Sequence, residues 1–448
     1  MICKMLRALP GLRRRLHRRG LLLLSGGLLF LAVTSFYVTF FPRFKPVTTI
    51  EGSSLPKEFL SPFHTRVPSL DYCTHRIEEE VSVRRSERAP NKLHVTDYHV
   101  YKTFSQLSCR QISALFLHSQ PTEAEVNFPL AYVLQLYKGA GLFVKQLQFI
   151  YMPHNVYCIH IDASSSLEFV NAVEQVVRCL PNVYVTKKRI KVIYLHVSTV
   201  QAQLNCVEEL LESTVPWRYL LNLCGQDFPL YVNRGIVQGL QALNGRTNAE
   251  GCELTNATRG RTSSVFEVKQ RAPGHNFHES YQWVATGKKK TPAPYGIKIY
   301  KGSSYIAGTR EFCEYALHEE TAKALLKWLN DTIYVDESFF PSLYRHPGVP
   351  GAVPGKKQPE FITRAVKWFF PGAENICYGY WLRGICVLSL GDLSWALGPQ
   401  FQNRLFIQKI DFDYDAELID CLFVKVQERT RHPYSSNEIS WDGPCKDS

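Results

Sequence analysis

Residues 155–162 read NVYCIHID, and residues 217–225 read WRYLLNLCG. Both runs are apolar and rich in aromatic or β-branched residues, a pattern typical of strands buried on both faces of a sheet. Similar strand-like runs alternate with helical spacing along the neighbouring chain, with strands at 128–137, 182–187 and 191–196 and helices at 141–151, 165–178 and 199–213. This alternation predicts parallel βαβ units, and therefore an α/β fold with a doubly wound sheet.

Polar residues follow both quoted strands. Asp162 ends the first run, and the segment Cys224–Pro229 (CGQDFP) ends the second and continues beyond it. Open α/β sheets bind ligands beyond the carboxyl ends of their strands, so we expect the functional site there. No GxGxxG follows the first strand and no GxxxxGK[ST] occurs, so the phosphate cradles of nicotinamide and P-loop proteins are missing. HExxH and GxSxG are also absent.

The positive charge of the chain is concentrated at its start. Of the net charge of +12, seven positive charges precede residue 20 with no acid among them, which leaves +5 for the rest. This distribution does not indicate a nucleic-acid-binding face. Residues 21–41 carry no charge and are long enough to cross a membrane as a helix. The positive residues before them predict a cytosolic tail at 1–20 and a lumenal remainder.

The alternative for residues 21–41 is a cleaved signal peptide. We disfavour it because the apolar run is long, and because Pro42 and Arg43 stand where small residues are expected. Residues 42–115 alternate proline, serine and charge without a sustained period, and we interpret them as a stem. A globular domain is then expected at 116–448. Residues 244–295 are polar and look like a long surface excursion, while 305–310 resembles a strand and 310–330 a helix.

Of the 13 cysteines, only Cys3 precedes the apolar segment. The others would face an oxidising compartment, where disulfides are the default. A zinc site is the weaker alternative, because no C-x-x-C pair is present and the tightest lumenal spacing is Cys377 to Cys386. Two N-glycosylation triplets, at Asn256 and Asn330, agree with a lumenal location.

Eight segments carry a more specific signal: FPLAY (128–132), IYMPHNVYCIHID (150–162), QAQLNC (201–206), LNLCGQDFPL (221–230), VDESFFPSL (335–343), RHPGVPG (345–351), AVKW (365–368) and CVLSLGDLSW (386–395). In order, and over roughly 300 residues, they resemble the β-1,6-N-acetylglucosaminyltransferases that build core 2 and I-type glycan branches, known as glycosyltransferase family 14. The resemblance implies a GT-A-like doubly wound mixed sheet with helices on both faces, carried on a type II single-pass anchor in the Golgi membrane.

The resemblance implies a role for several residues. It places Glu337 on the catalytic acid, where a carboxylate would take the proton from an attacking hydroxyl. Arg383 and Lys409 match two basic side chains that stabilise the leaving diphosphate without a metal. The plain alternatives are a solvated glutamate near a helix start and solvated surface bases, and for Lys409 the plain alternative is nearly as strong.

Three residues are expected to hold the UDP-sugar: Gln135, Asp162 and Tyr194. At a strand end, Asp162 could instead cap a turn. For the acceptor, the resemblance points to Glu250, Arg261 and Trp368. A tryptophan face can stack on a sugar ring, although a core tryptophan is the ordinary alternative.

No metal site is expected. Asp411-Phe-Asp413 fits the D-x-D pattern that holds Mn²⁺ in many transferases of this fold class, but we interpret it as an incidental match on a loop. The resemblance implies four disulfides, Cys73–Cys421, Cys109–Cys179, Cys158–Cys206 and Cys377–Cys386, and a free thiol at Cys224 near the nucleotide. Spacing alone leaves the pairing open, and Cys252, Cys313 and Cys445 have no assignable counterpart.

Several positions depart from the family pattern. Thr258 stands where the family has an acceptor-binding lysine, Phe370 replaces a tyrosine, and Phe340 replaces a tryptophan. Gln203 replaces an aspartate, and 197–199 replace a W-S-R segment. Each lost substrate hydrogen bond costs about 0.5–1.5 kcal/mol, so these changes predict a different acceptor or a lower rate.

The expected function is therefore inverting transfer of N-acetylglucosamine from UDP-GlcNAc, in β-1,6 linkage, to an O-glycan of the Galβ1-3GalNAc type. One alternative is a catalytically weak or inactive Golgi relative that binds glycans or partner transferases. A weaker one is transfer of another sugar, such as xylose. Neither a cofactor nor a nucleic-acid partner is expected, and a homodimer is left open.

Overall fold

The structure is a computed structural model. In it the chain forms two compact units, residues 1–53 and 54–448. It describes residues 68–82, 95–117, 120–271, 281–355, 357–372 and 376–429, all within the second unit. The predicted cytosolic tail and membrane segment lie outside these residues. Within the described ranges, no helix combines the length and apolar character needed to cross a membrane.

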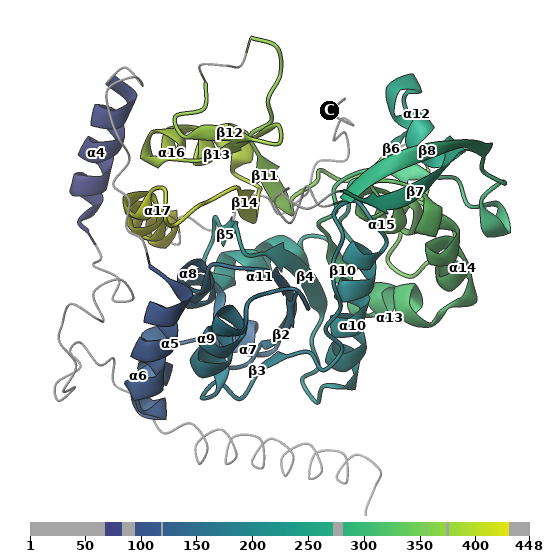
Figure 1. Cartoon of the computed structure of the whole chain (residues 1–448). Helices are drawn as coiled ribbons and strands as arrows, with labels where there is room; N and C mark the ends of the chain where they lie inside the picture. The colour runs from purple at the N-terminus through teal and green to yellow at the C-terminus, as the bar shows by residue number, and fades with distance from the viewer. Residues whose placement is uncertain are drawn as a thin grey trace, which may run out of the picture. The chain divides into compact units, whose positions relative to one another are not determined.

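The described chain alternates helices and strands for most of its length (Figure 1). The helices are α4 Leu70–Ser82, α5 Asp97–Gln106, α6 Cys109–Phe116, α7 Glu123–Val126, α8 Ala140–Ile150, α9 Leu167–Val177, α10 Ser198–Glu212, α11 Asn233–Gln241, α12 Asn256–Ser263, α13 Arg310–His318, α14 Glu320–Trp328, α15 Asp336–Tyr344, α16 Leu393–Ala396 and α17 Ala416–Arg429. The strands are β1 Leu130–Leu136, β2 Val156–Ile161, β3 Val183–Val185, β4 Tyr219–Cys224, β5 Asp227–Pro229, β6 Cys252–Glu253, β7 Ser264–Gln270, β8 Tyr281–Lys289, β9 Tyr300–Lys301, β10 Ala307–Thr309, β11 Arg364–Val366, β12 Tyr380–Leu382, β13 Ile385–Val387 and β14 Phe406–Gln408.

A five-stranded sheet in the order β10-β4-β1-β2-β3 forms the centre. Strands β1 to β4 are parallel, and β10 pairs with β4 in the antiparallel direction. The sheet is therefore mixed, as predicted. Because β1, β2 and β4 are almost entirely buried, their sequences are continuously apolar rather than alternating.

The strand order reverses direction at β1, which is what makes the sheet doubly wound. Helices α8 and α9 connect β1, β2 and β3 in one direction, and α10 leads back to β4. Right-handed crossovers then place α10 on the opposite face from α8 and α9, as Figure 1 shows. Gln135 and Cys224 are register partners at the carboxyl ends of β1 and β4, beside this switch point.

One predicted strand is wrong. Residues 191–196 form a loop, because their backbone bonds to side chains instead of to a neighbouring strand. The Val192 N–H donates to Asp162 Oδ2 at 2.8 Å, and the Ile193 N–H donates to Ser198 Oγ at 2.8 Å. Leu195 has a positive φ of 66°, which no strand residue adopts.

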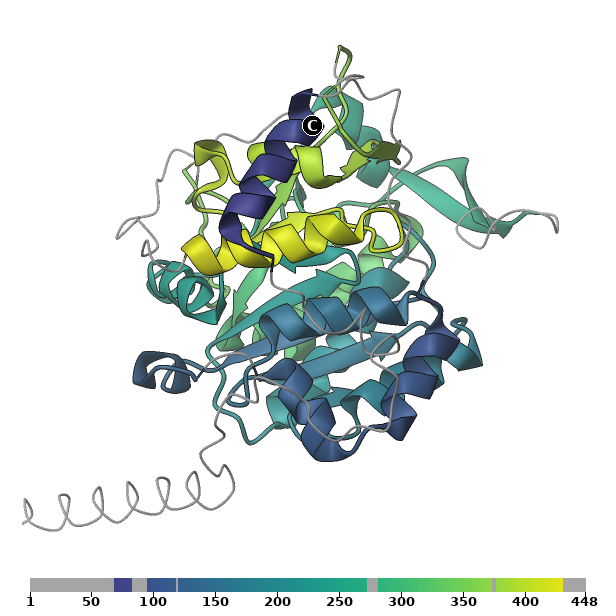
Figure 2. The ribbon, with the colours of Figure 1, turned by 90° about the vertical axis from the view of Figure 1, so that its left-hand side faces the viewer.

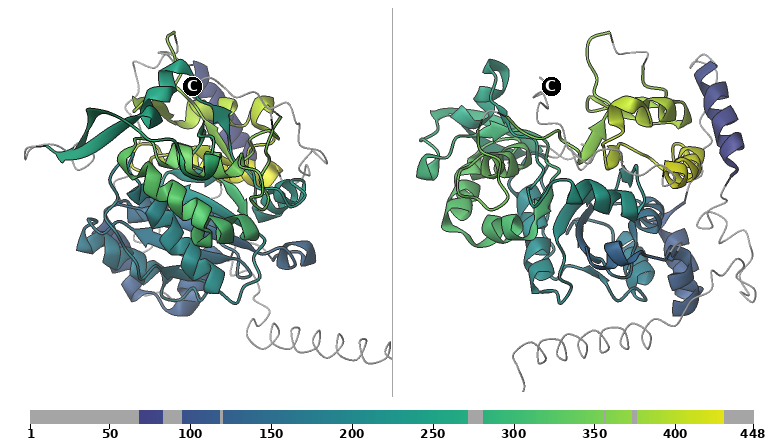
Figure 3. Two further views of the ribbon diagram at one scale, coloured as in Figure 1. Left: turned by 90° about the vertical axis from the view of Figure 1, so that its right-hand side faces the viewer. Right: turned by 180° about the vertical axis from the view of Figure 1, so that it is seen from behind.

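The polar excursion at 244–295 is more ordered than its composition suggests. It contains α12 and a hairpin of β7 and β8, which projects from the rest of the described chain (Figures 2 and 3). The predicted helix at 310–330 is divided into α13 and α14, because the backbone at Glu319 is extended.

A three-stranded sheet, β11-β14-β5, adjoins the central sheet and carries the C-terminal part of the site. Part of the predicted stem, in contrast, is helical. Within it, α5 contacts α9, and α4 lies beside α17 near the end of the described chain (Figure 2).

Disulfides join segments that are distant in sequence. The structure contains Cys73–Cys421, Cys109–Cys179, Cys158–Cys206 and Cys377–Cys386, the four pairs implied by the family resemblance. Cys252 is also disulfide-bonded, while Cys224 and Cys313 are free.

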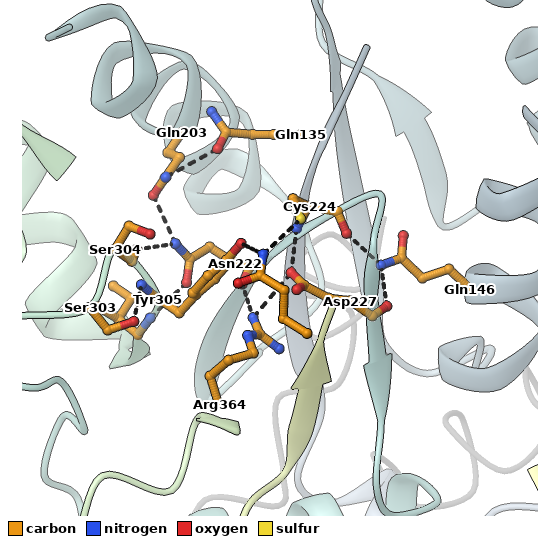
Figure 4. Close-up of polar contacts among 12 residues, drawn as sticks. Gln135, Gln146, Gln203, Asn222, Cys224, Asp227, Ser303, Ser304, Tyr305 and Arg364 are labelled. Atoms are coloured by element: carbon orange, nitrogen blue, oxygen red, sulfur yellow. Dashed lines mark hydrogen bonds and ion pairs between the residues drawn. The ribbon is translucent and has the colours of Figure 1, made fainter. Parts of the chain in front are cut away.

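A buried ion pair within the smaller sheet also bonds to β4 of the central sheet (Figure 4). Arg364 on β11 lies 3.3 Å from Asp227 Oδ2 on β5, and both side chains are fully buried. Arg364 also donates to the Asn222 carbonyl of β4, while Asp227 accepts from the Cys224 N–H at 2.6 Å. Burial raises the pKa of Asp227, and the charge of Arg364 opposes that shift.

We predict that Asp227→Ala lowers the free energy of unfolding by about 3–5 kcal/mol, because it leaves the Arg364 cation buried without its counter-charge. Urea denaturation measures the loss. Glu208→Gln, which removes the exposed partner of Lys188, serves as the control and should leave stability unchanged. Equal stability of Asp227→Ala and the wild type would contradict this role of the pair.

Candidate active site

Glu337 lies in the first turn of α15 and forms an ion pair with Arg261 from the last turn of α12. Arg261 Nη1 donates to Glu337 Oε2 at 2.8 Å, and both side chains are about two-thirds buried. The Arg261 guanidinium also lies 3.9 Å from the centre of the Tyr334 ring. This contact fixes the direction from which Arg261 approaches the carboxylate.

The environment of Glu337 disfavours its charged form. Burial and the neighbouring Asp336 carboxylate raise the pKa of Glu337 to about 7, and the positive charge of Arg261 holds it from rising further. Burial likewise raises the pKa of Asp336 to about 6. A carboxyl group with a pKa near 7 can exchange a proton with a bound hydroxyl at neutral pH.

Gly302 lies between the backbone of Glu250 and α15, and its lack of a side chain lets the two come close together. The Gly302 N–H donates to the Glu337 carbonyl at 2.9 Å, and a Cβ at Gly302 would lie 1.9 Å from the Glu250 carbonyl oxygen. Only glycine permits this approach. The chain at Glu250 therefore lies beside the helix that carries Glu337.

Arg383 occupies the turn of the β12–β13 hairpin. Leu382 pairs with Ile385, so the turn consists of Arg383 and Gly384, and their φ angles are +53° and +74°. Two central residues with positive φ are typical of a type I′ turn, in which asparagine and glycine are preferred. The sequence therefore keeps an arginine where the backbone disfavours one, a combination often found at functional sites.

The Arg383 guanidinium lies 4.7 Å from the centre of the Tyr194 ring. Burial raises the pKa of Tyr194, the charge of Arg383 opposes the shift, and the charges of Asp336 and Glu337 add to it. Tyr194 therefore lies within electrostatic range of both Arg383 and Glu337.

Lys409 follows β14 and is half-buried. Burial lowers the pKa of Lys409. Electrostatic interaction with the Cys224 and Asp227 side chains opposes this shift, and the positive charge of Arg383 adds to it. Lys409 thus lies near the carboxyl end of β4, with Arg383 within electrostatic range of it. Burial raises the pKa of the Cys224 thiol to about 11, which keeps it neutral.

Trp368 is 49% exposed and lies beside the Arg383 turn. It forms a β-bridge with Ile385, and the next residue, Phe369, donates its N–H to the Gly384 carbonyl at 2.8 Å. Its exposed ring does not belong to the core, which was the ordinary alternative. An exposed tryptophan can stack on a sugar ring.

Gln135 and Asp162 have partners within the chain. Gln135 donates to the Thr199 carbonyl at 2.9 Å and accepts from Gln203. Both Asp162 oxygens accept backbone N–H groups, Oδ1 from Ser164 and Oδ2 from Val192. The bond to Ser164 caps the turn after β2, as the turn-capping alternative proposed, and the bond to Val192 orders the loop after β3. Direct contact with a nucleotide stays a prediction.

Some of the departures from the family pattern have a structural role. The Thr258 hydroxyl accepts the Thr255 N–H in a capping box and is 4% exposed, and Phe340 is buried against Phe339. Gln203 joins Gln135 to Asn222, the amide bridge shown in Figure 4. Phe370 is exposed.

The two aspartates of the D-x-D segment lie in the turn between β14 and α17. Asp411 accepts from the Tyr380 hydroxyl at 3.0 Å and from the Asp413 N–H at 3.1 Å. Elsewhere, Cys377, Cys386 and Asp392 lie close enough together to suggest metal ligands. The two sulfurs are bonded to each other, so they offer no thiolates. Asn256 and Asn330 are both exposed, as glycan attachment requires.

Sequence reasoning did not identify two aromatic residues, Tyr334 and Trp283. Tyr334 directly precedes the Val335-Asp-Glu segment, and its stacking on Arg261 could not be expected from its position alone. Trp283 lies in the polar excursion. Its large apolar ring among polar residues was the one signal that could have marked it as a contact residue.

The sequence profile of the Core-2/I-Branching enzyme family matches residues 130–395, which contain Glu337, Arg261 and Arg383. The chain belongs to this family. A mouse N-acetyllactosaminide β-1,6-N-acetylglucosaminyl-transferase is 38% identical over 310 residues, covering 69% of this chain and 75% of the relative. The human protein of the same name is 36% identical over 338 residues, covering 75% and 82%. Human β-1,3-galactosyl-O-glycosyl-glycoprotein β-1,6-N-acetylglucosaminyltransferase 3 is 34% identical over 339 residues, covering 73% and 74%.

We predict that two features of Arg383 act on stability in opposite directions. Its positive φ lowers the free energy of unfolding, and its contact with the Tyr194 ring raises it. In a Tyr194→Leu background, Arg383→Asn should raise the free energy of unfolding by about 1 kcal/mol, because asparagine tolerates positive φ. In the wild-type background the gain should be smaller by about 0.5–1 kcal/mol, since the cation–π contact is lost. A four-variant urea denaturation cycle measures this coupling. Equal effects in both backgrounds would show that the two side chains are independent.

Proposed function

We propose that this member of the Core-2/I-branching family is an inverting β-1,6-N-acetylglucosaminyltransferase. The donor is UDP-GlcNAc, and the acceptor is the 6-hydroxyl of an O-glycan of the Galβ1-3GalNAc type. One observation carries the proposal: a carboxylate with a pKa near 7, Glu337, lies within electrostatic range of the same tyrosine that contacts the cationic Arg383. The names of the relatives support the sugar and the linkage.

In this mechanism Glu337 is the general base. It takes the proton from the acceptor hydroxyl as the oxygen bonds to the anomeric carbon, and the bond from that carbon to the diphosphate breaks. UDP leaves with the bonding electron pair, and attack from the opposite face inverts the configuration. Arg261 holds the Glu337 carboxylate in position before the acceptor arrives.

Negative charge develops on the diphosphate as UDP leaves. Arg383 and Lys409 are the side chains that would neutralise it. Fixed cations can serve this purpose in place of a divalent metal, so we propose transfer without a metal.

Further contacts divide between the two substrates. Gln135, Asp162 and Tyr194 lie on the donor side, with Asp162 acting through the loop that it orders. For the acceptor, Glu250, Arg261 and Trp368 supply a carboxylate, a guanidinium and an aromatic face.

The proposed location is the Golgi membrane. Residues 1–20 would lie in the cytosol, 21–41 would span the membrane, 42–115 would form the stem, and 116–448 would be lumenal. Four disulfides and the exposed Asn256 and Asn330 support an oxidising, glycosylating compartment.

A second candidate is a weakly active or inactive relative that binds glycans or partner transferases. The buried Thr258 hydroxyl favours it, because the capping box keeps this side chain from an acceptor. A transfer assay with an acceptor array distinguishes the two functions.

We predict that the purified full-length protein transfers labelled GlcNAc to at least one member of an acceptor array, and that Glu337→Gln reduces transfer by about 100-fold or more. The isosteric amide keeps the shape but cannot take a proton. Glu360→Gln, a carboxylate paired with Arg404 away from Glu337, is the control.

Each reaction is repeated with a chelator, which should leave the rate unchanged. Sensitivity to the chelator would contradict the proposed roles of Arg383 and Lys409. No transfer to any acceptor would favour the second candidate.

We predict that kcat/KM falls as the pH drops below about 7, because protonation removes the base. Arg261→Met should move this acidic limb to higher pH, since the arginine charge holds the Glu337 pKa down. Arg259→Met, an exposed arginine of the same helix, should leave the limb in place. An acidic limb unaffected by Arg261→Met would show that another group titrates there.

A further inference from the structure

Trp283, on β8, contacts the loop that carries Tyr194. The indole Nε1–H donates to the Tyr194 carbonyl at 3.2 Å, and the indole ring lies 5.7 Å from the His196 ring. Two residues earlier, the Tyr281 ring lies 5.1 Å from Lys191 Nζ of the same loop. The start of β8 therefore contacts the loop after β3 at several points.

The pairing of β7 with β8 explains why Trp283 faces this loop. Trp283 lies opposite Val268, and Phe266 lies opposite Ala285, so these side chains share one face of the hairpin. The opposite face carries Glu267, Lys269 and Gln282, with Val284 across from Glu267. The hairpin projects from the rest of the described chain (Figure 3). Trp283 itself is half-buried, and its hydrogen bond to Tyr194 is exposed.

The loop conformation at this point is not one that its sequence prefers. Leu195, which follows the carbonyl held by Trp283, has a φ of 66° without being glycine or asparagine. Such a residue persists when its surroundings determine its conformation. On its inner side the loop bonds to Asp162 and Ser198, and on its outer side to Trp283.

Tyr194 connects this loop to the β12–β13 turn that carries Arg383. Its carbonyl accepts from Trp283, while its ring contacts the Arg383 guanidinium. Arg383 stands in an exposed turn, and a long side chain there can adopt many rotamers. Whatever fixes the Tyr194 ring therefore also limits where the guanidinium can lie.

We propose that Trp283 is a positioning residue for the diphosphate: it fixes Tyr194, and Tyr194 in turn holds the Arg383 guanidinium in the place where the leaving group binds. The hairpin has a second connection to the site, because β7 continues directly from α12, which carries Arg261. The β7–β8 hairpin thus joins the segment that contacts the base to the segment that contacts the diphosphate-binding arginine.

This inference rests on the proposed use of UDP-GlcNAc, so its test begins with binding rather than turnover. Calorimetry on the purified full-length protein measures the affinity for UDP and for uridine, which lacks phosphates. Trp283→Phe keeps an aromatic ring but removes the N–H donor. We expect it to weaken UDP binding by about two- to tenfold, the effect of losing one hydrogen bond, and to leave uridine binding unchanged.

Trp328→Phe is the matched control. Trp328 Nε1 donates to the Thr291 carbonyl at 3.1 Å, so the variant removes the same kind of bond at a position that does not contact Tyr194. It should leave both affinities at wild-type values. In transfer assays, Trp283→Phe should raise the KM for UDP-GlcNAc and leave the KM for the acceptor unchanged.

A double variant tests the route through Arg383. In an Arg383→Met background, Trp283→Phe should produce no further loss of UDP affinity, because the guanidinium that it positions is gone. An undiminished loss in that background, or equal losses for UDP and uridine, would overturn the inference. So would a Trp283→Phe protein that binds UDP as the wild type does, although the proposed function would stand. A wild-type protein that fails to bind UDP would overturn the proposed function and this inference with it.

Discussion

The buried ion pair of Arg364 and Asp227 is the contact on which the geometry of the site depends. It joins β11 and β5 of the smaller sheet to β4 of the central sheet, so it fixes where Lys409 lies relative to the carboxyl ends of β1 and β4. Two charges without water are stable only with such compensation. The nearby bond from Gln408 to Tyr305 places the residue before Lys409 against the same cluster.

Around this ion pair, the acidic and basic side chains of the site lie in different places. Glu337 is paired with Arg261 on one side, while Arg383 and Lys409 lie together on the other, with Tyr194 in electrostatic range of both sides. Burial moves the carboxyl group toward neutrality and makes the lysine less basic, so both shifts have the same physical cause. A carboxylate and two cations with these properties suit a reaction that removes a proton at one end and releases a diphosphate at the other.

Sequence patterns predicted the central strands and helices well, because buried parallel strands have continuous apolar runs and the helices between them have a clear period. The loop at 191–196 was missed because its apolar residues resemble a strand, and only the three-dimensional contacts of Asp162 and Ser198 prevent it from forming one. The site residues came from the family resemblance. Periodicity alone could not have distinguished Glu337 from a solvated glutamate, since its raised pKa depends on Asp336 and on burial by distant segments.

The bond between Cys73 and Cys421 has a consequence for the covalent integrity of the protein. It spans 348 positions of the sequence and joins α4 to α17, so nearly the whole described domain lies inside one covalent ring. A protease that cuts a surface loop within this ring opens it without releasing a fragment. A nicked protein would therefore keep its two halves attached, heavier than the intact one only by the water of hydrolysis, until a reductant separates them.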